Sequence, residues 1–245
     1  MQNPYESERV LAEYLYFHYP PDDAGPLPIP VGAVGFPRRV VAELLDGVDG
    51  LDRALDVGCA VGGTAFELAR LARGVVGIDF SSSFIAAADE LRRRGELECN
   101  VPVEGGTTSS HVARVRAGID RSRVSFEVGD AMALRGDLGS FDAVVAANLV
   151  CRLAEPLKFL DRLPDLVIPG GHLVLATPFS WLAEYTPVEN WLGGTELRAS
   201  GWMTLREVLS PSFELEQTRD LPFLILEHSR KYQYGISLGS RWRRR

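Results

Sequence analysis

Three aspartates stand where the chain could hold a nucleotide-like ligand. Asp56 lies in LDVGCAVGG, a stretch that runs from an apolar segment into a glycine-rich turn. Asp79 ends the next apolar segment, GVVGID, and Asp130 follows a third, in VGDA. A carboxylate can accept hydrogen bonds from vicinal ribose hydroxyls or from an adenine amino group, and glycines let a ligand approach the backbone. We expect these three aspartates to share one site for an adenosine-containing ligand.

The glycine turn differs from two common nucleotide motifs. Gly58, Ala60 and Gly62 are spaced at twos, so the turn does not match the GxGxxG of dinucleotide-binding proteins. The lysine of a phosphate-binding P-loop is missing from the sequence GCAVGG, which excludes that motif here. A nicotinamide-dependent oxidoreductase is the alternative from another class, and the glycine spacing together with Asp130 argues against it.

The elements that must position these residues follow from an alternation of strand-like and helix-like segments. We expect strands at 53–58, 74–80, 123–131, 141–150 and 170–178, helices at 64–73, 81–95, 156–167 and 204–210, and closing antiparallel strands at 213–221 and 222–229. This alternation predicts an α/β fold whose seven-stranded, mostly parallel sheet carries helices on both faces. The carboxyl ends of parallel strands share one edge, so the three aspartates would meet there.

Two regions stand outside the alternation. Residues 1–46 hold an aromatic-rich helix, a proline-rich crossing and a second helix, which we interpret as an N-terminal helical cap. Residues 95–123 form an insertion within the domain of residues 47–245. We expect the cap and the domain to make a single compact unit.

Composition limits the partners and the compartment. The 245 residues carry a formal net charge of −7, with a pI near 5.2, which argues against a nucleic-acid-binding protein. We expect the C-terminal RWRRR run to fold back, with Trp242 packed and its neighbours solvated. The sequence has no signal-peptide pattern, no apolar run of about 20 residues and no CxxC pair. We therefore expect a cytoplasmic protein without membrane contact, metal or disulfides.

The aspartates and the glycine turn together resemble class I S-adenosylmethionine-dependent methyltransferases. Between about residues 51 and 178 the chain has their D-x-G-x-A-x-G pattern, an acid after the second strand and G-D-A after the third. Ala60 stands where many members have glycine, which is tolerable if its φ is negative. The resemblance implies a Rossmann-like fold, S-adenosylmethionine as cofactor and S-adenosylhomocysteine as product. It implies cofactor contacts at Arg38, Asp56, Gly58, Ala60, Gly62, Asp79, Phe80, Asp130, Ala131 and Asn148.

The two ends of the chain carry a closer resemblance. The chain is similar to the thiohistidine (4-mercaptohistidine) N-methyltransferases of ovothiol biosynthesis in YESERVLAEYLYFHYP, FPRRV, LDVGCAVGGTAFELAR with GIDFS, VEGG, and EHSRKYQYGIS with RWRR. That activity is often the C-terminal domain of a bifunctional ovothiol synthase. The resemblance therefore implies a stand-alone transferase, with an upstream sulfoxide synthase as its pathway partner. The implied reaction methylates an imidazole ring nitrogen of 5-thiohistidine to give ovothiol.

The implied chemistry selects further residues. A ring nitrogen attacks through its lone pair, so a nearby group must fix the tautomer and accept any surplus proton. The candidates for that role are His18, His228, Tyr14 and Asn148, whereas His111 and His172 are interpreted as structural. Arginine suits the substrate carboxylate and aromatic walls suit its ring. The substrate candidates are Phe17, Tyr19, Arg152, Phe179, Trp181, Arg230, Lys231 and Tyr232.

Two alternatives share the same cofactor residues. One is a class I methyltransferase that acts on another small molecule, such as an amine or a phenol, and the other is a cofactor-binding protein without turnover. Methyltransferases of nucleic-acid amino groups usually carry a [DN]PP[YF] motif after the fourth strand, where this chain reads ANLVCRL. That absence and the acidic charge favour a small-molecule substrate.

Overall fold

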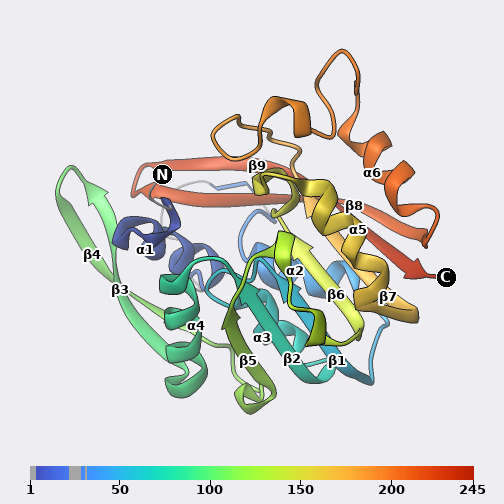
Figure 1. Cartoon of the computed structure of the whole chain (residues 1–245). Helices are drawn as coiled ribbons and strands as arrows, with labels where there is room; N and C mark the ends of the chain where they lie inside the picture. Colours follow the sequence, from blue (N-terminus) through green and yellow to red (C-terminus); the bar gives the residue numbers. More distant parts are fainter. Residues whose placement is uncertain (1–3, 22–28, 31) are drawn as a thin grey trace.

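The computed structural model describes residues 4–21, 29–30 and 32–245 (Figure 1). Its main sheet has the strand order β5-β2-β1-β6-β7-β9-β8. The strands are β1 (Leu51–Val57), β2 (Ala72–Asp79), β5 (Val124–Val128), β6 (Phe141–Ala147), β7 (Val167–Thr177), β8 (Phe213–His228) and β9 (Lys231–Arg244). All run parallel except β8 and β9, and β9 pairs antiparallel with both β7 and β8. The predicted seven-stranded, mostly parallel sheet is therefore confirmed.

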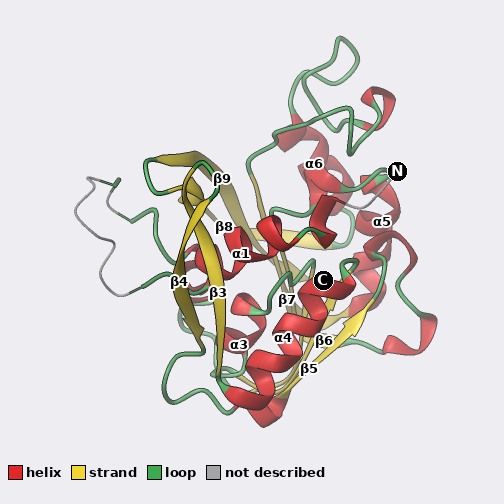
Figure 2. Cartoon of the chain, turned by 90° about the vertical axis from the view of Figure 1, so that its left-hand side faces the viewer, coloured by secondary structure: helices red, strands yellow, loops and turns green. Residues whose placement is uncertain are grey.

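Helices cover both faces of this sheet (Figure 2). They are α1 (Glu8–His18), α2 (Phe36–Leu44), α3 (Gly63–Leu68), α4 (Ser82–Arg94), α5 (Pro156–Leu166) and α6 (Gly201–Leu209). Helices α1 to α4 share one buried cluster with Ala54 and Val145, whereas α5 and α6 share the other with Leu55 and Val144. Neighbouring residues of β1 and β6 thus face opposite cores, as strands buried on both sides require. Short 3-10 helices lie at Pro4–Glu6 (η1), Arg121–Arg123 (η2), Ala131–Ala133 (η3), Gly136–Leu138 (η4), Val150–Arg152 (η5) and Val188–Asn190 (η6).

Helix α3 is shorter than the 64–73 that the sequence predicts. It ends at Leu68, and β2 already begins at Ala72. The backbone N–H of Leu51 donates to the carbonyl of Leu71 at 3.0 Å, so hydrogen bonding to β1 begins just before β2. The end of the predicted helix, from Ala72 onward, therefore belongs to β2 and pairs with β1.

The closing strands differ from the prediction. Residues 213–228 form one strand, β8, and its partner β9 consists of the C-terminal residues that were expected to be a tail. Pro222 interrupts the expected pattern but is tolerated because β8 lies at the edge of the sheet, where a missing N–H costs no ladder bond. The expectation that Trp242 packs is confirmed, since it is 1% exposed beside Trp202.

Two hairpins extend around the cap. Residues 95–123 contain β3 (Glu96–Glu104) and β4 (Thr107–Arg114), which form a separate antiparallel pair against α1. Pairing between β7 and β9 stops at Thr177 and Leu238, so the far half of the β8–β9 hairpin projects past the carboxyl edge of the sheet toward α1 (Figure 1). The Ser229 hydroxyl at its tip donates to the Val103 carbonyl at 2.8 Å, which joins the two hairpins.

The predicted proline-rich crossing of the cap, residues 20–30, lies mostly outside the described residues. In the part of the chain that the structure describes, no helix has the length and apolar character needed to cross a membrane.

Replacing Trp242 with alanine should lower the free energy of unfolding by about 3–5 kcal/mol, because it leaves a cavity where β9 closes the sheet. Arg245→Ala is the matched control, since that side chain is exposed on the same segment. Urea unfolding of both variants measures the difference. Equal stability of the two variants would show that the C-terminal strand does not hold the sheet together.

Candidate active site

The glycine turn between β1 and α3 is built from backbone conformations that favour glycine. Gly58 has φ 74° and Gly62 has φ 86°. Ala60 has φ 46°, so the expectation of a negative φ is wrong. A left-handed alanine costs about 1–2 kcal/mol, and the bond from its N–H to Asp79 Oδ2 (2.8 Å) helps to hold it there. The turn therefore holds a left-handed residue at each of Gly58, Ala60 and Gly62.

Asp79 is fixed in orientation by the backbone on both sides. Its Oδ2 accepts the Ala60 N–H, and its Oδ1 accepts the Ser81 N–H at 2.9 Å. Burial raises the pKa of this carboxyl, while these N–H donors lower it. The next residue, Phe80, is 64% exposed, which is unusual for so large an apolar side chain. An oriented carboxylate beside a bare aromatic ring suits a ligand with hydroxyls and a flat ring system.

Asp56 is the buried acid of the site. It is 1% exposed, and its Oδ2 has no hydrogen-bond partner among the described residues. Burial, followed by the nearby charge of Asp79, raises its pKa to about 8. A buried acceptor without a donor is costly, and an ammonium group of a bound molecule would satisfy it.

Asp130 joins this edge from β5. Its Oδ1 accepts the Met132 N–H at 2.8 Å and caps η3, which begins with the buried Ala131. The Gly129 N–H donates to the Asp79 carbonyl at 2.9 Å, so the ends of β2 and β5 are held together. The structure thus brings Asp56, Asp79 and Asp130 to one edge of the sheet, as predicted.

Asn148, after β6, is already engaged by its neighbours. It has φ 56°, its N–H donates to the Ala176 carbonyl at 2.7 Å, and its Oδ1 accepts the Ser237 hydroxyl at 2.6 Å. With that amide oxygen used by β9, Asn148 fits poorly as a proton acceptor. Its placement links the closing hairpin to the carboxyl edge.

His18 contacts the glycine turn from the cap. Its Nδ1 accepts the Gly63 N–H at 3.1 Å, so the neutral ring carries its proton on Nε2. Burial lowers the pKa of His18 to about 3. His18 therefore fits poorly as a proton acceptor, because the ring is weakly basic and the lone pair on Nδ1 already accepts a hydrogen bond.

Tyr14 belongs to a group that we call the tyrosine–arginine cluster, which consists of Tyr5, Tyr14, Tyr185 and Arg152. Tyr5 lies 6.0 Å from Tyr14 and 6.1 Å from Tyr185, measured between ring centroids. The Arg152 guanidinium lies 5.0 Å from the Tyr185 ring centroid. Ser81 donates its hydroxyl to the Tyr5 carbonyl at 3.2 Å and its N–H to Asp79, which places the cluster beside this carboxylate.

Several predicted substrate residues lie elsewhere. Phe17 packs in the core against Phe36 and Phe223, and the buried Tyr19 donates its hydroxyl to the Val61 carbonyl at 2.7 Å. Tyr19 therefore ties the cap to the glycine turn. Arg38 is exposed on α2. Phe179 (φ 51°) and Trp181 lie in the loop after β7 and pack on the second core.

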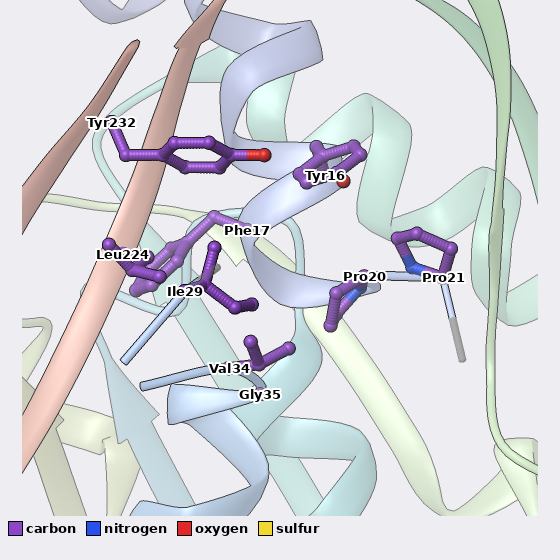
Figure 3. Close-up of a pocket in the computed structure, with 9 residues that line it drawn as sticks. All are labelled: Tyr16, Phe17, Pro20, Pro21, Ile29, Val34, Gly35, Leu224 and Tyr232. Atoms are coloured by element: carbon purple, nitrogen blue, oxygen red, sulfur yellow. The ribbon is translucent and has the colours of Figure 1, made fainter. Parts of the chain in front are cut away.

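The residues predicted from the last hairpin gather at its far end. Tyr232 lies beside Tyr16 and lines a small apolar hollow next to α1 with Phe17 and Leu224 (Figure 3). His228, Arg230 and Lys231 form the hairpin tip next to β3, and Lys231 pairs with Glu227 at 2.6 Å. The chain folds these four residues against α1 and β3, so they are not among the contacts of the glycine turn.

Two members of the cluster, Tyr5 and Tyr185, were missed in the sequence. Tyr5 lies in η1 and Tyr185 in the loop after β7, 180 residues apart in the numbering. Tyr5 opens the YESERVLAEYLYFHYP stretch but was given no role, and Tyr185 lies in no motif, so only the tertiary fold brings the two together. The described residues contain no group of three metal-ligating side chains that could hold an ion.

Comparison with known proteins agrees with this geometry. Residues 55–175 match the family model described as "Methyltransferase domain". Curated relatives include the ubiquinone biosynthesis O-methyltransferases of Alkalilimnicola ehrlichii, 31% identical over 56% of this chain and 45% of that protein, and Dinoroseobacter shibae, 30% identical over 51% and 40%. The chain spans less than half the length of these relatives.

Solved structures share the fold at low identity. The N-methyltransferase NodS from Bradyrhizobium japonicum WM9, in complex with S-adenosyl-L-homocysteine, has a TM-score of 0.57 at 16% identity, covering 96% of this chain and 98% of that one. The [4+2]-cyclase SpnF has a TM-score of 0.58 at 19% identity, covering 98% and 93%. The family match confirms the predicted methyltransferase fold, which the solved structures share, and a methyltransferase domain at residues 55–175 agrees with the predicted enzyme class and S-adenosylmethionine cofactor.

Asp79→Ala should weaken S-adenosylmethionine binding by about 1.5–3 kcal/mol, because it removes a charged hydrogen-bond acceptor. Titration calorimetry measures the affinity, and Asp137→Ala, which removes an exposed acid from η4, is the control. Unchanged affinity in Asp79→Ala would exclude this carboxylate from the cofactor site.

Asp56 should make both stability and cofactor binding depend on pH. Between its ordinary pKa of 3.8 and about 8 the folded protein keeps the proton that the unfolded chain releases. The free energy of unfolding should therefore fall as pH rises through this window, and Asp56→Asn should flatten that slope.

A bound ammonium group lowers the pKa of Asp56, so cofactor binding near pH 7 should release a proton. Calorimetry in buffers of different ionisation enthalpy measures that release, and equal release by Asp56→Asn would contradict the assignment.

Proposed function

We propose that this chain, a class I S-adenosylmethionine-dependent methyltransferase, methylates an imidazole ring nitrogen of thiohistidine (4-mercaptohistidine). The observation that carries the proposal is the tyrosine–arginine cluster beside Asp79, which combines aromatic walls with a fixed positive charge. The choice of thiohistidine rests on the sequence resemblance of the cap and the last hairpin to thiohistidine methyltransferases. The upstream sulfoxide synthase remains the proposed pathway partner.

The cofactor would be held by the residues already at the carboxyl edge. Asp79 suits the ribose hydroxyls, Phe80 and Asp130 suit the adenine, and Asp56 suits the ammonium group of the methionine part. When bound, the cofactor supplies an activated methyl group on a positively charged sulfur. The protein then has to orient the acceptor nitrogen and exclude water.

The protonation states near the site favour a nitrogen acceptor over a phenol. A phenol with its ordinary pKa near 10 needs a base to ionise it before it attacks. His18 has a pKa of about 3 and an occupied Nδ1, and burial raises the pKa of Tyr14 to about 12. Neither group takes a proton readily at neutral pH. An imidazole nitrogen needs no such base, since its lone pair is available at neutral pH.

The cap would help to form the substrate side of the site. Helix α1 contributes Tyr14, and η1 contributes Tyr5. Glu6 of η1 accepts the backbone N–H groups of Ser82 and Ser83 (2.8 and 3.2 Å), which fixes η1 on the first turn of α4. The cap is thereby anchored to the strand end that carries Asp79.

Purified protein should transfer one methyl group from S-adenosylmethionine to thiohistidine and much less to histidine. Mass spectrometry of reactions with thiohistidine, histidine, a catechol and small amines measures the product in each case. His18→Ala in the same assay separates a catalytic from a structural role. We expect it to change stability more than kcat, because the ring is a neutral hydrogen-bond acceptor.

Methylation of the catechol in place of thiohistidine would overturn the proposal in favour of O-methylation. Binding of the cofactor without any product in the panel would overturn it too, in favour of a different small-molecule acceptor.

A further inference from the structure

The tyrosine–arginine cluster is richer in donors than the orientation of a ring requires. Three phenols and one guanidinium converge from η1, α1, η5 and the loop after β7. Burial raises the pKa of both Tyr5 and Tyr14, so both phenols stay protonated at physiological pH. A set of O–H donors around one cation is suited to a negatively charged group.

Resting on the proposed function, we infer that this cluster binds the ionised sulfur of the substrate and thereby selects a ring thiolate over the parent imidazole. The cluster is then the specificity determinant of the site. The aromatic rings and the positive charge provide a weakly hydrated surface for a large, polarisable anion.

The hydrogen bonds of Arg152 limit which of its donors can hold an anion. One terminal nitrogen, Nη1, donates to the carbonyls of Cys151 (3.1 Å) and Ser180 (2.8 Å). The two terminal nitrogens of Arg152 therefore cannot act together on one anion, and its Nε and Nη2 donors are the ones left for a ligand. Its face is directed at the Tyr185 ring. A single diffuse anion fits beside these remaining N–H groups.

Holding the sulfur as a thiolate would also remove the need for a base. Arginine and phenol donors stabilise the thiolate over the thiol. The anionic sulfur feeds electron density into the ring, so the neutral ring nitrogen becomes a better nucleophile. The ring keeps its other N–H proton when that nitrogen gains a methyl group, and the product is a zwitterion with a cationic ring and an anionic sulfur. No proton has to leave, which agrees with the weak basicity of His18.

The test compares binding of three ligands in the presence of S-adenosylhomocysteine: thiohistidine, histidine and mercaptoimidazole, which has the sulfur but no carboxylate. The variants are Arg152→Gln, Tyr185→Phe and Tyr14→Phe, which keep most of the side-chain shape. Tyr16→Phe is the matched control, because Tyr16 lies on the same helix as Tyr14 but lines the small apolar hollow with Tyr232. Calorimetry measures the affinities, and ultraviolet absorption follows ionisation of the bound thiol.

We expect Arg152→Gln to weaken thiohistidine and mercaptoimidazole about tenfold to a hundredfold, and each phenylalanine variant to weaken them about twofold to tenfold. Histidine affinity and the Tyr16→Phe control should stay unchanged. The apparent pKa of the bound thiol should rise in Arg152→Gln.

Loss of thiohistidine affinity with mercaptoimidazole unaffected would overturn the inference, because the cluster would then hold the carboxylate. Equal losses for histidine would overturn it too. If wild-type protein binds thiohistidine no better than histidine and methylates neither, the proposed function itself fails. If it methylates thiohistidine while the variants keep their selectivity, the function stands and only the sulfur assignment fails.

Discussion

The carboxylate of Asp79 is the interaction on which the site depends. It accepts one N–H from the glycine turn and one from the residue that caps α4. The same cap residue, Ser81, donates its hydroxyl to the Tyr5 carbonyl at 3.2 Å. One side chain therefore sets the turn after β1, the start of α4 and the position of η1. The cofactor edge and the cap share this anchor, so a change at Asp79 reaches both.

A second anchor closes the opposite side of the site. Asn148 ties β6 to β7 through its N–H and to β9 through its side chain. The hairpin that carries Ser237 then continues past the sheet and reaches α1 and the β3–β4 hairpin. Parallel strands leave their carboxyl edge open to ligands, and here the cap and the last hairpin cover it from two sides.

The sequence predicted what depends on local pattern and missed what depends on distant contacts. The alternation of strands and helices, and the aspartates at strand ends, follow from periodicity and spacing, and they were predicted correctly. The φ of Ala60 could not be read from the sequence, because it depends on an acceptor supplied 19 residues later. From the implied chemistry His228 was predicted as a proton acceptor, and Arg230 and Lys231 as substrate residues, yet pairing in β8 and β9 places them at the hairpin tip. Tyr5 and Tyr185 meet only through the fold.

The charges around the carboxyl edge give the site its chemical character. Acids are gathered where the cofactor would present hydroxyls, an amino group and a positive charge, and where we propose that the substrate binds, phenols and one arginine replace them. A neutral histidine lies between these two sides, with its lone pair held by the glycine turn. A cationic donor and an anionic acceptor fit such a division, because each brings a net charge opposite to that of its surroundings. Methyl transfer then leaves both products with a net charge of zero at the reacting groups. A neutral acceptor that must lose a proton would need a base at this boundary, where His18 is held neutral and hydrogen-bonded. The division of charge therefore argues for positioning and electrostatic complementarity as the source of catalysis, with proton transfer left out.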